Sequence, residues 1–234
     1  MSDIRNVTIV GPLPPPAGGM ANQTRKLAEF LRAEGCKVNV IQVNPPYVPT
    51  FIGKVPVVRA GFRLLQYVFS LFKGLRDTDV VHIMANSGWS WHLFAAPAIW
   101  IAKMKGKPVV LNYRGGYAKT FFDKSWFWVK PSMQRCDKVI VPSVFLQEVF
   151  EEFSCQADIV PNVLDQKNFY SNEREIATQA PHLIVTRNLE QIYDVDTAIR
   201  AFHIVQQRYP QAKLSVAGTG PELDNLKALT KTLN

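Results

Sequence analysis

Short apolar runs alternate with longer amphipathic segments along the chain as far as residue 160. Each run has the length of a strand, and each following segment repeats apolar residues every three or four positions. This alternation predicts α/β architecture with a Rossmann-like, doubly wound parallel sheet. The expected strands are residues 7–10, 37–43, 79–84, 108–113, 138–142 and 158–160, and the expected helices are residues 20–34, 57–76, 91–104 and a segment that starts at 143.

Two of these helices have a recognisable apolar face. In the first helix, Leu27, Phe30 and Leu31 fall on one side at helical spacing. The side of the last helix that we expect to be buried consists of Phe145, Val149, Phe150 and Phe153.

A second α/β domain begins near residue 181. Strand-like runs at residues 182–186 and 213–217 enclose an arginine-led loop and an amphipathic segment. A complete α/β domain usually needs about 100–150 residues, and the chain ends at Asn234. We therefore expect an N-terminal Rossmann-like domain in residues 1–175 and an incomplete second Rossmann-like domain in residues 176–234.

Composition narrows the choice of partners. The formal net charge of +8 favours polyanions such as nucleic acid, anionic lipid or phosphorylated substrates.

Cys36, Cys136 and Cys155 lack the spacing of a zinc site or a disulfide framework, which indicates a reducing compartment. The chain begins without a signal-peptide pattern, and its longest apolar run, residues 93–102, is shorter than the roughly 20 residues of a membrane span.

Glycine-rich and polar loops follow the expected strands, where ligands of open α/β sheets bind. Gly18 and Gly19 precede the first helix, and free N–H groups there suit an anionic or hydroxyl-rich ligand. A simple tight turn is the alternative, and the spacing is not that of a dinucleotide fingerprint. Arg114 precedes two glycines, and it fits either a phosphate or carboxylate site or a surface turn.

The loop of residues 86–92 combines hydrogen-bonding groups with aromatic surface. Asn86, Trp89 and His92 suit a sugar, because aromatic faces meet apolar ring faces and amides meet hydroxyls. A helix cap with Trp91 packed in the core is the alternative. His82, inside the preceding strand, is expected to be a packed histidine.

Residues 59–76 combine many aromatic and aliphatic side chains with four arginines and lysines. Such a segment suits an anionic membrane surface, and core packing with a solvated basic face explains it equally well. Trp126-Phe127-Trp128, close to Lys124 and Lys130, forms a second candidate interfacial patch.

Further short motifs occur in a fixed order: Gly18-Gly19, residues 79–82, 107–110 and 136–143, residues 160–162 with Phe169, residues 187–202 and residues 216–221. In this order they resemble the retaining GT-B glycosyltransferases, the family 4-like group of cell-wall and lipopolysaccharide sugar transferases. The resemblance covers nearly the whole chain. It implies transfer of a hexose-type sugar, with retention, from a nucleotide-diphosphate sugar to a glycan or lipid-linked acceptor. It also implies no cofactor and no metal.

The resemblance assigns roles to individual residues. Gly18 and Gly19 would lie near the donor phosphate and sugar, and Arg187 would steady the diphosphate leaving group. Arg114 stands where the family often has a histidine and would share that catalytic role with Arg187. The acceptor-binding residues implied are Asn86, Trp89, His92 and Asn162.

Two departures from the family pattern limit these roles. Tyr193 and Asp194 stand where the family has a Lys-Gly pair. The family's paired glutamates and nucleotide-base pocket would fall beyond Asn234, so we expect the fragment to be inactive alone. The alternatives are a nucleotide-sugar epimerase, a non-catalytic binding or regulatory module, and a gene remnant. No nucleic-acid partner is expected, and the expected location is cytoplasmic, at the inner membrane face.

Overall fold

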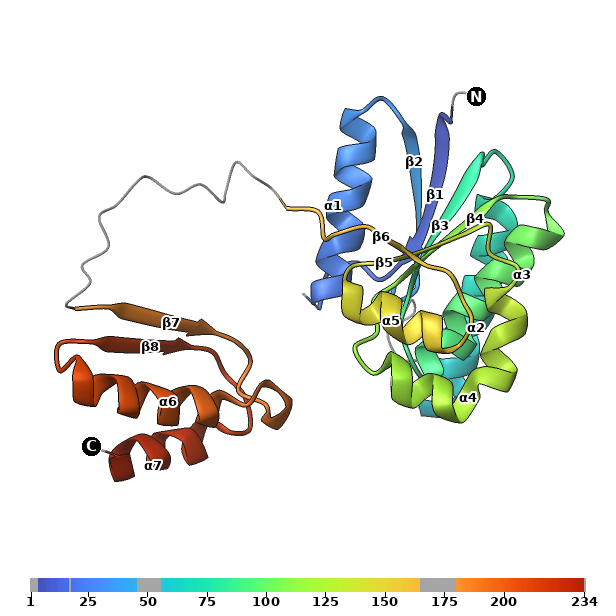
Figure 1. Cartoon of the computed structure of the whole chain (residues 1–234). Helices are drawn as coiled ribbons and strands as arrows, with labels where there is room; N and C mark the ends of the chain where they lie inside the picture. Colours follow the sequence, from blue (N-terminus) through green and yellow to red (C-terminus); the bar gives the residue numbers. More distant parts are fainter. Residues whose placement is uncertain (1–3, 17, 46–55, 165–179, 234) are drawn as a thin grey trace. The chain divides into compact units, whose positions relative to one another are not determined.

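The computed structural model describes residues 4–16, 18–45, 56–164 and 180–233. They belong to two compact units, Met1–Asp165 and Gln166–Asn234, which are described separately (Figure 1). The domain boundary expected between residues 175 and 176 lies outside the described residues, as does Phe169.

One six-stranded parallel sheet, in the order β2-β1-β3-β4-β5-β6, forms the centre of the first unit. The chain moves outward from β1 to β2 and then returns to β3 on the other side of β1, which makes the β1/β3 junction the topological switch point. The predicted doubly wound α/β fold is confirmed. The strands are β1 Asn6–Gly11, β2 Lys37–Gln42, β3 Val80–Ala85, β4 Val109–Tyr113, β5 Lys138–Val141 and β6 Asp158–Ile159.

Helices cover both faces of this sheet. The first helix packs on one face beside β1, and the remaining helices form a layer on the opposite face. One helix of this layer, residues 118–133, was not predicted from the sequence. The helices are α1 Gly19–Ala33, α2 Pro56–Gly74, the π-helical turn η2 Trp91–Ala95, α3 Ala96–Met104, α4 Ala118–Met133 and α5 Val144–Glu152.

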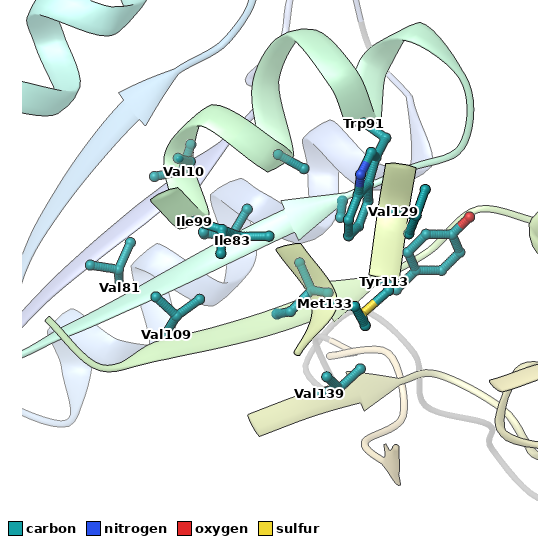
Figure 2. Packing of buried hydrophobic residues seen from close by; sticks show 14 of the residues in the cluster. Val10, Val81, Ile83, Trp91, Ile99, Val109, Tyr113, Val129, Met133 and Val139 are labelled. Carbon is teal, nitrogen blue, oxygen red and sulfur yellow. The ribbon is translucent and has the colours of Figure 1, made fainter. Parts of the chain in front are cut away.

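The main core lies between the sheet and the layer of α2 to α5. Figure 2 shows strand side chains such as Val81 and Val109 packed with side chains from the helical layer, among them Ile99 and Met133. Each large apolar side chain that is fully buried contributes about 1.5–3 kcal/mol relative to the exposed state. The carboxyl ends of the strands are therefore presented by a rigid scaffold.

Two side chains on the apolar faces of the predicted helices are exposed. Phe30 on α1 is 42% exposed, because α1 approaches the sheet with the small residues Ala21, Thr24 and Ala28. Phe145 in the first turn of α5 is 58% exposed, and Leu146 is buried in its place. The expectation that Phe145 is buried is wrong.

The second unit contains a two-stranded parallel sheet covered by helices. Its core consists of Leu189, Val195, Ile199 and Leu226. Across all described residues, no helix has both the length and the apolar character needed to cross a membrane. The elements are β7 His182–Thr186, the 3₁₀ turn η4 Gln191–Tyr193, α6 Val195–Arg208, β8 Lys213–Ala217 and α7 Leu223–Leu233.

Candidate functional site

Polar side chains of the first unit gather at the carboxyl edge of the sheet. Because the strands are parallel, the loops that follow β1, β3, β4 and β6 all emerge at this edge. Asn86 follows β3, Arg114 follows β4, and Asn162 lies three residues beyond β6. This is the edge at which open α/β sheets bind their ligands.

Arg114 is held by amide side chains on two sides. Its Nε donates to Asn112 Oδ1 at 3.0 Å, and its Nη1 donates to Asn162 Oδ1. The buried Asn112 in turn contacts His82, with 3.1 Å between Nδ2 and Nε2. A hydrogen-bonded chain therefore runs from Asn162 at the edge through Arg114 and Asn112 to His82. Among the described residues, Arg114 Nη2 has no hydrogen-bond partner.

The direction of each hydrogen bond in this chain follows from the arginine. A guanidinium only donates, so Asn112 Oδ1 accepts and Asn112 Nδ2 is turned toward the histidine. Nδ2 then donates to His82 Nε2, which places the histidine proton on Nδ1. Burial and the nearby Arg114 cation lower the pKa of His82 to about 4, and burial lowers the pKa of Arg114. At neutral pH this hydrogen-bonded group of four side chains therefore carries a single positive charge, on Arg114.

The depressed pKa of His82 predicts acid lability of the first unit. An unfolded chain binds a proton at this histidine near pH 6.5, whereas the folded chain does so near pH 4. Stability is therefore lost as the pH falls through this window, by about 3 kcal/mol at its lower end. We expect urea unfolding monitored by tryptophan fluorescence to show this loss between pH 7 and pH 4 in the wild type. The loss should be much smaller in His82→Gln, and an equal loss in the wild type and in this variant would contradict the lowered pKa of His82. The control variant is His203→Gln in the second unit.

Segment 162–164 is fixed to α1 by one glutamine. Gln23 Nε2 donates to the carbonyl of Val163 at 3.2 Å, and the Val163 N–H donates to Gln23 Oε1 at 3.0 Å. Gln23 lies one turn after Gly19, and Val163 directly follows Asn162. This clamp therefore brings the start of α1 and the Arg114–Asn162 pair to the same region of the edge.

Gly18 and Gly19 form an open entry to α1. Both glycines are exposed, and a Cβ atom at either position would have no neighbour within 4 Å. Gly18 caps the helix without a side-chain hydrogen bond. The first N–H groups of α1 are thus available to an anionic or hydroxyl-rich ligand.

The loops after β3 and β4 are in direct contact. A Cβ atom at Gly115 would lie 2.5 Å from Ser87 Oγ and 2.7 Å from Asn86 Oδ1, so only glycine fits there. Ser87 Oγ and the buried Tyr113 hydroxyl are hydrogen-bonded at 2.8 Å, and burial raises the pKa of Tyr113 to about 12. The Asn86 carboxamide accepts from the Ser87 N–H at 2.8 Å, which uses this oxygen within the loop.

An aromatic surface borders the same loops. Trp89 is 78% exposed, and its ring lies edge-on to His92 with 6.2 Å between centroids. The His92 ring contacts Phe121 of α4 at 5.7 Å. Trp91 is fully buried, so the loop supplies a core tryptophan and an exposed one three positions from its histidine.

Arg187 lies in the second unit, directly after β7. Its guanidinium is 5.3 Å from the centroid of the Tyr193 ring, within the range of a cation–π contact. The loop that carries it is pressed against Gly218 and Gly220, where a Cβ atom would come within 1.9 Å of the Arg187 carbonyl and 2.3 Å of the Leu189 carbonyl. A residue with a Cβ atom would therefore clash with the backbone at either position, so both positions require glycine.

Three residues that contribute to the site were not predicted from the sequence: Asn112, Gln23 and Tyr113. Asn112 is the single amide in an otherwise apolar strand of residues 109–113, which is a usable signal of a buried polar contact. Gln23 and Tyr113 carry no comparable signal.

Among the described residues, no group of three or more histidine, cysteine, aspartate or glutamate side chains could hold a metal ion.

Residues 17–167 match the family model described as Glycosyltransferase Family 4. The match covers well over half of the chain. The chain belongs to glycosyltransferase family 4. The predicted family is thus confirmed, and no curated protein matches this family 4 chain in sequence.

Solved structures with a TM-score of 0.50 or above agree with this assignment at the level of the fold. A S. aureus TarM mutant in complex with fondaparinux, alpha-GlcNAc-glycerol and UDP is 14% identical, with a TM-score of 0.54 over 74% of this chain and 34% of that one. Pneumococcal O-GlcNAc transferase GtfA in complex with UDP and GlcNAc is 14% identical, with a TM-score of 0.48 over 71% and 34%. The kitacinnamycin glycotransferase is 11% identical, with a TM-score of 0.50 over 92% and 66%. The family 4 chain thus spans about a third of the length of the first two structures, and its first unit is a Rossmann-like domain of the GT-B fold.

Proposed function

We propose that the family 4 chain contributes the acceptor-side domain, and the beginning of the donor-side domain, of a retaining glycosyltransferase. The reaction moves a hexose-type sugar from a nucleotide-diphosphate sugar to an acceptor. The observation that carries this proposal is the hydrogen-bonded chain that fixes the Arg114 cation at the carboxyl edge of a family 4 domain. The chain spans 34% of the TarM structure, and we propose that transfer needs a longer polypeptide that carries this chain.

The chemistry requires positive charge where the diphosphate leaves. A guanidinium that is already fixed stabilises such developing charge without reorganisation. Arg114 is held through Nε and Nη1, which leaves its Nη2 donors for a phosphate oxygen. Arg187 supplies a second cation from the donor-side unit, and the N–H groups after Gly18 and Gly19 supply further donors. We propose that these groups act without a cofactor or a metal ion.

The exposed aromatic surface supports a proposal for the acceptor class. Trp89 and His92 offer ring faces to a pyranose, while Asn162 and Asn86 lie at neighbouring strand ends. We propose that these four residues bind the saccharide part of a glycan or lipid-linked acceptor. The three cysteines are free, which fits a cytoplasmic location.

A transfer assay tests the proposal. The longest polypeptide that carries this chain is incubated with a panel of nucleotide-diphosphate sugars and saccharide acceptors. We expect acceptor-dependent release of the nucleoside diphosphate, retention of the anomeric configuration by NMR, and no turnover by residues 1–234 alone. Arg114→Ala should lower kcat by about 100-fold or more, as removal of one preorganised donor does. The control is Arg25→Ala, which removes an exposed arginine of α1 that pairs with Glu29 at 3.9 Å.

Other outcomes separate the alternatives. Isomerisation of the free donor sugar without transfer would identify an epimerase. Binding of the donor or acceptor with no turnover by the longest polypeptide would identify a binding or regulatory module.

A further inference from the structure

Helix α2 is apolar on two opposite sides. Tyr67 and Leu71 face the core and are buried, as expected for a helix that covers a sheet. Leu65, Phe69 and Phe72 follow one another at spacings of four and three residues on the other side, and they are 73%, 70% and 42% exposed. The two interpretations of this helix, core packing and an interfacial surface, therefore apply to different sides of it.

The exposed apolar side of α2 continues onto the neighbouring helices. Figure 1 shows α2, α3 and α4 in the layer on one face of the sheet, so their outer sides point away from the sheet together. Exposed side chains on the outer sides of the three helices form what we term the interfacial face: Leu65, Phe69, Trp100, Met104, Phe127 and Trp128.

Cation–π contacts join the helices of the interfacial face. Lys105, just after α3, places its Nζ 5.6 Å from the ring centroid of Phe72 on α2. The Arg135 guanidinium, just after α4, lies 3.7 Å from the Trp100 ring on α3. Trp100 Nε1 also donates to Ser132 Oγ of α4 at 3.0 Å. These contacts thus link α2 to α3 and α3 to α4 within the helical layer.

The surface is strongly basic. The sequences of α2 and α3 contain no aspartate or glutamate, and that of α4 contains one acidic residue, Asp123. Lys124 and Lys130 flank the Phe127–Trp128 pair, whose rings are 5.1 Å apart, and Lys73 adjoins Phe72. Aromatic side chains with interspersed lysines are the composition of helices that lie in the interface of an anionic membrane.

We propose that the interfacial face docks the first unit on an anionic lipid bilayer, with the aromatic side chains in the headgroup region and the lysines on lipid phosphates. Apolar side chains such as Leu65 and Met104 find a favourable environment there and none on a nucleic-acid backbone. A second copy of the chain would bring two basic surfaces together. This binding surface is separate from the site at the carboxyl edge of the sheet and does not depend on sugar transfer.

Vesicle sedimentation of the 234-residue chain tests the proposal. We expect binding to vesicles of phosphatidylcholine with 30% phosphatidylglycerol, weakened by salt, and little binding to pure phosphatidylcholine. The triple variant Phe69→Ser, Phe127→Ser and Trp128→Ser should reduce the partition coefficient by about 10-fold or more. These three side chains are more than two thirds exposed, so the fold should survive; Ile204→Ser, at a 67% exposed position of the second unit, is the control.

A charge-matched pair of variants separates local from overall attraction. Lys73→Glu, Lys124→Glu and Lys130→Glu together should lower binding by on the order of 100-fold or more. Lys213→Glu, Lys227→Glu and Lys231→Glu change the net charge equally in the second unit and should have a small effect. Failure of the wild type to bind anionic vesicles would overturn the proposal. Equal losses in the two triples, or a dimer in light scattering that the aromatic triple dissociates, would overturn it as well.

Discussion

Gly218→Ala is expected to destabilise the second unit strongly while the stability of the first unit is unchanged. The added methyl group would lie 1.9 Å from the carbonyl oxygen of Arg187, a backbone atom that cannot move aside as a flexible side chain would. The Leu189 N–H donates to the Thr219 carbonyl at 3.0 Å, so the two loops cannot separate without losing hydrogen bonds. Overpacking of a rigid site costs about 1–3 kcal/mol or more. A unit of this size has a stability of only about 3–10 kcal/mol.

Hydrogen exchange followed by mass spectrometry measures this effect by segment. Peptides from residues 182–217 should lose protection in Gly218→Ala, while peptides from β1, β3 and β4 keep theirs. Gly116→Ala is the matched control, because a Cβ atom there meets no neighbour within 4 Å. Retained protection of β7 and β8 in Gly218→Ala would show that the loops can separate.

Arg187→Ala is expected to lower the kcat of the longest polypeptide that carries this chain. Loss of a cation that stabilises the leaving diphosphate costs about 2–4 kcal/mol of transition-state stabilisation, which is about 30- to 1,000-fold in kcat. The guanidinium rests against Tyr193, and the backbone of Arg187 is fixed by the contact with Gly218. Removing the side chain should therefore change the charge at the site without moving the loop.

Steady-state kinetics of transfer, with the melting temperature as a check on folding, measures this loss. Arg200→Ala on α6 is the control, since it removes an exposed arginine that pairs with Asp196 at 3.6 Å. A kcat equal to that of the wild type in Arg187→Ala would remove this residue from the mechanism and leave Arg114 as the candidate cation.

The strands of the first unit were predictable for a physical reason. Parallel strands are covered on both faces, so they appear in the sequence as continuous apolar runs, as at residues 80–85 and 109–113. Helix α4 was missed because Phe127 and Trp128 face outward and Pro131 lies inside the helix, which blurs its apolar period. Helical spacing placed Phe30 on the apolar face of α1, but it does not show how closely that face approaches the sheet.

The site was predictable only in part. Arg114 and Asn162 follow strands, and strand ends at a parallel edge converge whatever the intervening sequence is. Their partners are a different matter. Asn112 bonds to a histidine 30 residues away, and Gln23 bonds to Val163 across 140 residues. Such pairs depend on the register and spacing of the finished sheet, which local sequence patterns do not encode.

The bond between Arg114 and Asn162 joins positions 48 residues apart. Because the arginine also fixes the orientation of Asn112, a change at either end alters the surroundings of the other. Substitutions at 114 and 162 should therefore be strongly epistatic. The loss of activity in the double variant should be close to that in each single variant and smaller than the sum of the two losses. Once this arginine is replaced in evolution, the asparagine that follows β6 can therefore change at little further cost.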